Sequence, residues 1–499
     1  MTVEKLSGMS NTQIAEYLTD FKETEVFRRS DPTESGLAQT LEKCVEADPQ
    51  KFTDNLLPFQ GVRALYQSSL LRGFQDAWRD KKDFDWVVLL EFIHQILLSE
   101  QFWSEKYEDG LNCRNWVFAA AADLISDRTQ DDTHAFDAQL LPLAEKILLI
   151  LAEKTEPSVF TPTDSSLDAL SSDKGKVFSA MVNYALRFAC LNDVELEFRW
   201  SHSIRANFTK RLDRNVESSL EFSYTLGFYL LDLLSLDERW VVGNINSIFS
   251  QQNEDHWQAA FSGCLLSSRY PHMNLYVWLK ANGHYRKALN TNFADKEVQG
   301  RLVRHICTGW IEDRETLDDK TSLIYQLIHS GNPNLLAGMV YFFSRRADNL
   351  SDKVKVKVMP AWRALFEVLS QHSNEVAYQN VLVSLSGWLG LIDKIDAEVL
   401  AWVKLSIKYV DRTPQPVNLE SFIQALLKNA SKTPEEVGEI YLGIPKNVLS
   451  RLWPGMPEIT QTVKILYSRQ HQETADAICN RFGEIGLDFL KELYQEYQR

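Results

Sequence analysis

His305 and Cys307 are a pair of residues that could carry out chemistry, because a thiolate beside an imidazole can act as a nucleophile. They stand at positions i and i+2 of a segment with helical character. On a helix these positions point about 200° apart, so the two side chains could not touch. We therefore expect a buried cysteine and a surface histidine, with no catalytic role for either.

Other signatures of catalysis are missing from the sequence. It contains no GxxxxGK[ST] phosphate loop, no HExxH zinc motif and no GxSxG elbow, and no GxGxxG follows a strand. Six cysteines are spread along it without a CxxC pair, which is typical of reduced thiols and not of a disulfide framework or zinc site. We therefore assign no catalytic, cofactor-binding or metal-binding residues and expect no cofactor.

Arg128 and His134 form an Arg-x5-His pattern that resembles the ribonuclease motif of HEPN domains. The segment between them is polar and contains Asp131 and Asp132, which suits an exposed turn better than a catalytic helix. A helical nuclease that uses this pair remains an alternative to a protein without catalytic activity.

A basic stretch from residue 199 to residue 214 allows a second alternative, in which arginines meet a phosphate backbone while aromatic rings stack on bases. Asp213 lies within the stretch, however, and the chain has a formal net charge of −15, which makes nucleic acid an improbable partner. We prefer a solvated helix face, followed by a protein-docking patch. The residues of this possible interaction patch are Arg199, Trp200, Arg205, Lys210, Arg211 and Arg214.

The elements that must position such residues are helices. Only 21 glycines and 15 prolines occur among 499 residues, so the elements should be long. Apolar residues at steps of three and four predict consecutive helices over 362–369, 378–389 and 399–410. The connection 391–396 is short enough to return the chain antiparallel to itself. We predict an all-α fold, an irregular HEAT-like helical repeat (α-solenoid) of antiparallel helix pairs.

Local signals predict several details of this fold. Asp85 and Asp396 should cap helices, and the sequence Thr433-Pro-Glu-Glu should form a capping box. The alternating Lys and Val of 353–358 would by themselves indicate a strand, but the helical surroundings favour a helix capped by Ser351. On the segment that follows Val62, the small residues Ser69 and Gly73 interrupt an apolar face that begins at Leu65.

The same signals give a domain organisation. We expect an N-terminal helical array over 1–155, a linker or loop over 156–175 where Pro, Ser, Thr and Asp accumulate, a middle helical region over 176–345, and C-terminal helical repeats over 346–499. The N-terminus is polar and the apolar runs are too short to span a bilayer. The sequence therefore predicts a cytoplasmic protein with no membrane contact.

Three stretches, 9–22, 84–93 and 174–186, together resemble the helical-repeat region of large bacterial multidomain proteins that carry an NTPase or nuclease module and act in antiphage defence. The resemblance implies a non-catalytic scaffold for protein recognition, the sensor or partner-binding part of such a system. Its partner would be an effector subunit or a phage protein.

Overall fold

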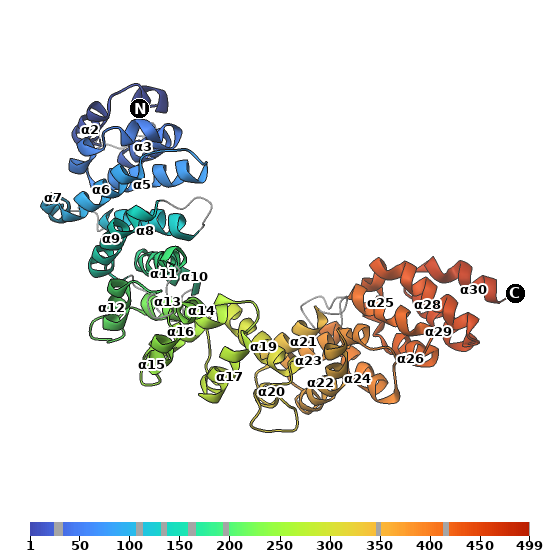
Figure 1. Cartoon of the computed structure of the whole chain (residues 1–499). Helices are drawn as coiled ribbons and strands as arrows, with labels where there is room; N and C mark the ends of the chain where they lie inside the picture. The colour runs from blue at the N-terminus through green and yellow to red at the C-terminus, as the bar shows by residue number, and fades with distance from the viewer. Residues whose placement is uncertain are drawn as a thin grey trace. The chain divides into compact units, whose positions relative to one another are not determined.

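The computed structural model of the protein describes residues 1–23, 33–105, 113–130, 137–157, 166–192, 199–345, 351–412 and 419–498 (Figure 1). All regular structure in these ranges is helical, and no strand occurs within them. The predicted all-α class is thus confirmed. Contacts divide the chain into two compact units, of which unit 1 comprises residues 1–268 and 293–295, and unit 2 comprises residues 269–292 and 296–499.

In the described residues of unit 1 there are helices α1 to α16 and two 3-10 helices. Their bounds are α1 Val3–Ser7, α2 Asn11–Asp20, α3 Glu34–Ala47, α4 Pro49–Thr53, η1 Leu57–Gly61, α5 Ala64–Arg79, α6 Trp86–Leu98, α7 Glu100–Ser104, α8 Cys113–Gln130, η2 Ala138–Leu140, α9 Leu141–Lys154, α10 Ser166–Ser171, α11 Asp173–Asn192, α12 His202–Arg211, α13 Leu220–Phe228, α14 Leu230–Leu236, α15 Glu238–Ile248 and α16 Glu254–Ser267.

The helices of unit 1 pack in chain order. One series, called here the first row, runs from α3 to α5, α8, α11, α13 and α16, each packed on the next. A second series runs from α6 to α9 and α12, and α9 also contacts α8 and α11. Figure 1 shows α5, α8 and α11 following one another in this way. Each first-row helix between the ends therefore has a neighbour on two sides.

Small residues allow this close packing. Ala119 to Ala122 are all buried in α8, which lies between α5 and α11. On α5, a Cβ added to Gly73 would lie 2.5 Å from the carbonyl oxygen of Glu42 on α3, closer than side chains tolerate. The small face predicted around Ser69 and Gly73 is thus where neighbouring helices approach α5.

The regular structure of unit 2 is likewise helical throughout its described residues. Its elements are α17 Met273–Ala281, α18 His284–Leu289, α19 Lys296–Ile311, α20 Leu323–Ile328, α21 Pro333–Ser344, α22 Asp352–Gln371, α23 Val376–Leu385, η5 Ser386–Leu391, α24 Ala397–Ile407, η6 Val410–Arg412, α25 Leu419–Ala430, α26 Pro434–Gly443, α27 Lys446–Leu449, η7 Ser450–Gly455, α28 Met456–Ser468, α29 Gln472–Gly483, η8 Asp488–Leu490 and α30 Lys491–Tyr497.

Contacts in unit 2 also follow chain order. One series joins α19, α21, α23, η5, α25 and α28, and another joins α24, α26 and α29. The apolar faces between these helices are buried. Trp362, Trp388 and Trp402, predicted to belong to the core, are at most 6% exposed. Trp362 contacts the rings of both other tryptophans.

Most of the predicted helix starts are confirmed. Asp85 accepts hydrogen bonds from the backbone N–H groups of Val87 and Val88, and Asp396 accepts one from Val399 at 2.9 Å. The Lys-Val alternation at 353–358 lies inside α22, as predicted, and Ser351 occupies its N-cap position, but the Ser351 side chain makes no capping hydrogen bond. These features are local, so the sequence contains all that determines them.

The predicted capping box at Thr433 is wrong. Thr433 occupies the N-cap of α26, but its hydroxyl caps no N–H group. It donates instead to the carbonyl oxygen of Asn429, 3.4 Å away in α25. Because Thr433 is buried beneath the end of the preceding helix, its side chain satisfies a carbonyl group there and not the amides ahead of it.

The predicted domain boundaries fall within the two units. The stretch 156–175 lies inside unit 1 and residue 345 lies inside unit 2. The part of the predicted linker that the structure describes after residue 165 is helical, since it contains α10 and the start of α11. Ser172 caps α11 by accepting a hydrogen bond from the Gly175 N–H at 3.0 Å, so this polar run begins a helix. Among the described helices, none has the length and apolar character needed to cross a membrane.

Candidate functional site

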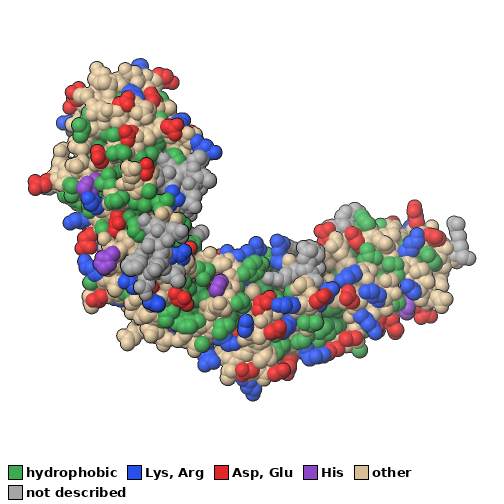
Figure 2. Space-filling model, viewed as in Figure 1, with side chains coloured by type: hydrophobic (Ala, Val, Ile, Leu, Met, Phe, Trp, Pro, Cys, Tyr) green, Lys and Arg blue, Asp and Glu red, His purple; other side chains and the backbone are tan. Residues whose placement is uncertain are grey.

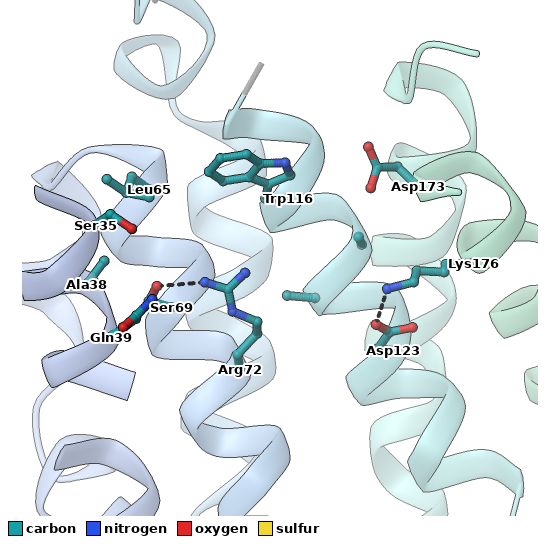
Figure 3. Close-up of a pocket in the computed structure, with 12 residues that line it drawn as sticks. Ser35, Ala38, Gln39, Leu65, Ser69, Arg72, Trp116, Asp123, Asp173 and Lys176 are labelled. Carbon is teal, nitrogen blue, oxygen red and sulfur yellow. Dashed lines mark hydrogen bonds and ion pairs between the residues drawn. The ribbon is translucent and has the colours of Figure 1, made fainter. Parts of the chain in front are cut away.

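A groove with a volume of about 320 Å³ crosses four first-row helices of unit 1 (Figure 3). Each of α3, α5, α8 and α11 contributes side chains to its lining, so the groove exists only because these helices are packed in sequence. Among the described residues that line it there is no histidine and no cysteine. The lining combines charged side chains with the indole ring of Trp116.

Two cations in the groove are already paired. Arg72 on α5 donates from Nε to Glu42 Oε2 at 3.0 Å and from an Nη to Ser69 Oγ at 2.9 Å. Lys176 on α11 donates to Asp123 on α8, with 2.8 Å between Nζ and Oδ2. Both pairs are partly exposed, so their main effect is to fix these side chains at the sides of the groove.

Asp173, the first residue of α11, differs from Arg72 and Lys176 in its pairing. It lines the groove and is half-buried, yet it forms no hydrogen bond or ion pair with any residue in the described ranges. Burial raises the pKa of its carboxyl group, Lys176 opposes that rise, and the nearby charge of Asp123 adds to it. A carboxylate in this position has hydrogen-bonding capacity that the fold leaves unused.

Trp116 on α8 supplies the largest apolar surface of the groove. It is half-buried and has no aromatic ring contact within the described part of the chain. In Figure 3 it lies across the middle of the group, with Leu65 on one side and Asp173 on the other. Half-exposed tryptophans with an adjacent charged group are frequent anchors in protein interfaces.

The structure gives most of the basic stretch 199–214 partners within the chain. Trp200 is 4% exposed and packs against Phe208 and Trp240, with ring centroids 5.4 and 4.9 Å apart. Arg211 is also 4% exposed and donates to Glu217 at 2.7 Å. These two side chains belong to the core of unit 1, so neither is available to a partner. The prediction that the whole basic stretch forms a solvated helix face is therefore wrong for Trp200 and Arg211.

The other members of the predicted patch lie nearer the surface. Their contacts are Arg199 to the carbonyl oxygen of Ser235, Arg205 to Asp237, Lys210 to Glu153, and Arg214 to the carbonyl oxygen of Ser247. Three of the four partners lie on α14, α15 or the short connection between them. These contacts tie α12 and the residues on either side of it to their neighbours. A role for the same residues in binding remains a prediction.

His305 is not on the surface, as the sequence led us to expect. It is 3% exposed, and its Nδ1 lies 2.9 Å from the Tyr285 hydroxyl group. Cys307 is buried as predicted. The expectation for His305 was wrong because α19 contacts five other helices, α17, α18, α20, α21 and α22, which together cover more than one of its faces.

The ribonuclease alternative falls on residues outside the description. His134 lies in the segment 131–136, and the side chain of Arg128 is not described. The pair therefore stays a prediction. Within the described ranges, no group of three or more His, Cys, Asp and Glu side chains is arranged to hold a metal ion.

Sequence reasoning did not find the groove. Leu65 and Ser69 were noted as part of an interrupted apolar face, and both line it. The other available signal was the run of four alanines at 119–122, because Ala119 and Ala120 line the groove together with Trp116. Comparison of the chain with protein-family models, with curated proteins and with solved structures finds no match.

Proposed function

We propose that this chain is a non-catalytic, HEAT-like helical-repeat scaffold that recognises a protein partner. In such arrays each repeat packs only on its neighbours, and the stacked helices present an extended binding surface. The chain-order packing of both units supports this reading.

A regular spacing of ion pairs in unit 2 supports the repeat. Ion pairs of similar sequence separation join Arg363 to Glu398, Lys404 to Glu439 and Lys446 to Glu484, at N···O distances of 2.6, 2.8 and 2.6 Å. The partners are 35, 35 and 38 residues apart in sequence. The three cations recur after 41 and 42 residues. Repeats of about 40–47 residues are typical of HEAT and armadillo arrays.

These pairs are exposed, so they add little stability. Their value here is as a sign of a repeat, because a cation and its anion recur at similar spacing along the sequence. Figure 2 shows side chains of both charges interspersed over the visible face of unit 2.

The observation that carries the recognition function is the groove. It combines side chains from four successive helices, includes a half-exposed indole and contains a carboxylate without a partner in the described ranges. Recognition would come from contact area along the stacked helices, with Trp116 as an anchor. In line with the family resemblance, we propose that the chain acts in the bacterial cytoplasm as the sensor or partner-binding part of an antiphage defence system.

Site-specific crosslinking tests this proposal. A photoreactive amino acid at Gln39, an exposed position of the groove lining, should crosslink in cells to a discrete protein, either a phage component or an effector subunit. The same amino acid at the exposed Glu91 of α6, which does not line the groove, should not crosslink to that protein. Crosslinking to RNA from both positions, or equal crosslinking to one protein from both, would contradict the proposal.

A further inference from the structure

Building on the proposed function, we infer that the groove takes a basic segment of the partner protein, with a Lys or Arg side chain of that segment paired to Asp173 and its aliphatic part lying on Trp116.

The charge balance of the groove determines the sign of the ligand. Arg72 is matched by Glu42, and Lys176 is matched by Asp123, at 3.0 and 2.8 Å. Asp173 has no such match in the described ranges, so the charged side chain of the lining that has no ion-pair partner there is an anion. An acidic or phosphorylated segment would place a second anion beside it, whereas a basic segment would supply the missing partner.

The position of Asp173 in the first turn of α11 does not explain why its side chain lines the groove. A carboxylate in the first turn of α11 interacts favourably with the helix dipole, by about 0.3–1 kcal/mol. That interaction would be equally available to a carboxylate turned towards solvent. Asp173 lines the groove instead, where burial raises the pKa of its carboxyl group, so a cation bound there would lower that pKa.

Trp116 suits the rest of a basic side chain. Long cationic side chains combine an apolar stem with a charged head, and the face of an indole ring attracts both through apolar contact and cation–π interaction. Ala119 and Ala120 form the adjoining apolar floor. A volume of about 320 Å³ is at the low end of the roughly 300–1,000 Å³ of ligand pockets, enough for the side chains of a short segment.

The charge of the whole chain acts in the same direction. With a formal net charge of −15, the protein attracts basic partners over a distance of about one Debye length and repels acidic ones. Specificity would then arise in the groove, where the carboxylate of Asp173 and the indole ring of Trp116 define the position of one basic residue.

A peptide selection on the full chain tests the inference. A display library of short random peptides is selected on the immobilised wild-type protein, and an enriched peptide is fluorescently labelled for anisotropy titration. We expect enrichment of Lys or Arg beside an apolar residue. Asp173→Asn should weaken binding of that peptide by about tenfold or more. Acetylating the peptide's lysine should weaken its binding to the wild-type protein to a similar extent. The same acetylation should cause no further weakening of binding to the Asp173→Asn variant.

Asp168→Asn is the matched control, since Asp168 is exposed on α10, lies five residues away and does not line the groove. It removes the same charge and should leave the affinity unchanged. If both variants weakened peptide binding equally, the effect would be due to the net charge of the protein and the inference would be overturned.

The outcomes also separate the inference from the proposed function. Enriched peptides that lack basic residues, lose affinity on Trp116→Leu and are indifferent to Asp173→Asn would overturn the inference while leaving the groove as a recognition site. Peptides indifferent to both substitutions would overturn the inference and also remove the groove from the proposed function. Thermal unfolding of each variant confirms that the fold is intact.

Discussion

Gly227 on α13 and Ala260 on α16 lie so close that a Cβ on Gly227 would stand 1.7 Å from the Ala260 carbonyl oxygen. The contact is reciprocal, because a Cβ on Gly263 of α16 would lie 2.3 Å from the carbonyl oxygen of Tyr224 on α13. The two helices therefore meet backbone to backbone, and their separation depends on glycine at both points.

Replacing Gly227 with alanine should destabilise unit 1 by at least about 2 kcal/mol, because the backbone of α16 must move to make room. Gly243→Ala is the control. No atom lies within 4 Å of a Cβ at that helical position, so the change should stabilise the protein by about 0.5–1 kcal/mol. Denaturant unfolding measures both, and a loss of stability that is equal in the two variants would contradict the close approach.

A buried charge network joins α11 and α12 to the segment before α13. Glu217 is 2% exposed and pairs with Lys174 at 2.8 Å and Arg211 at 2.7 Å. Burial alone would raise the pKa of Glu217, but hydrogen bonds and charge from Lys174, together with Ser219 and Arg211, outweigh it and hold that pKa below its ordinary value.

Glu217→Gln should therefore cost about 3–5 kcal/mol of stability, because two buried cations lose their counter-charge. The control is Glu439→Gln, which breaks the exposed pair with Lys404 and should leave the unfolding midpoint unchanged. A midpoint for Glu217→Gln close to that of the wild type would show that the network contributes no net stability.

Two buried histidines should make the fold sensitive to mild acid. Burial lowers the pKa of His256, in unit 1, and of His284, in unit 2, to about 4, and the charges of Arg214 and Lys287, respectively, add to the effect. Both groups bind a proton more readily in the unfolded chain, where the ordinary value is 6.5. Their contribution is thus fully present above pH 6.5 and is lost as the pH falls from 6.5 towards 4.

Each histidine should contribute about 3 kcal/mol to this loss. His256→Asn keeps a polar group near Ser223, whose Oγ lies 2.7 Å from His256 Nδ1, but cannot be protonated. The stability of the variant, measured by denaturant unfolding across this pH interval, should fall less steeply than that of the wild type. Identical slopes would mean that His256 does not titrate in this way.

The sequence predicted the features that depend on local interactions. The all-α class, the caps at Asp85 and Asp396 and the helix over 353–358 follow from residues within one or two turns of each other. Two caps were exceptions. Ser351 makes no capping hydrogen bond. At Thr433 the end of the preceding helix competes for the same hydroxyl group.

Features that depend on distant contacts were not accessible in this way. Trp200, Arg211 and His305 are buried by helices that lie elsewhere in the sequence, so their types and spacing did not reveal their environment. The groove shows the same limit. Leu65 and Ser69 gave a local sign of it, whereas Asp173 joins them only through the packing of α8 between α5 and α11.

The most direct test of the account is comparative capture of a protein partner by the wild-type chain, Trp116→Leu and Asp168→Asn, from bacteria with and without phage infection, with quantification by mass spectrometry. We predict a protein that is captured in near-stoichiometric amount by the wild type and by Asp168→Asn and is lost with Trp116→Leu. A partner captured equally by all three would show that recognition does not use the groove, and capture of RNA in place of a protein would contradict the scaffold function itself.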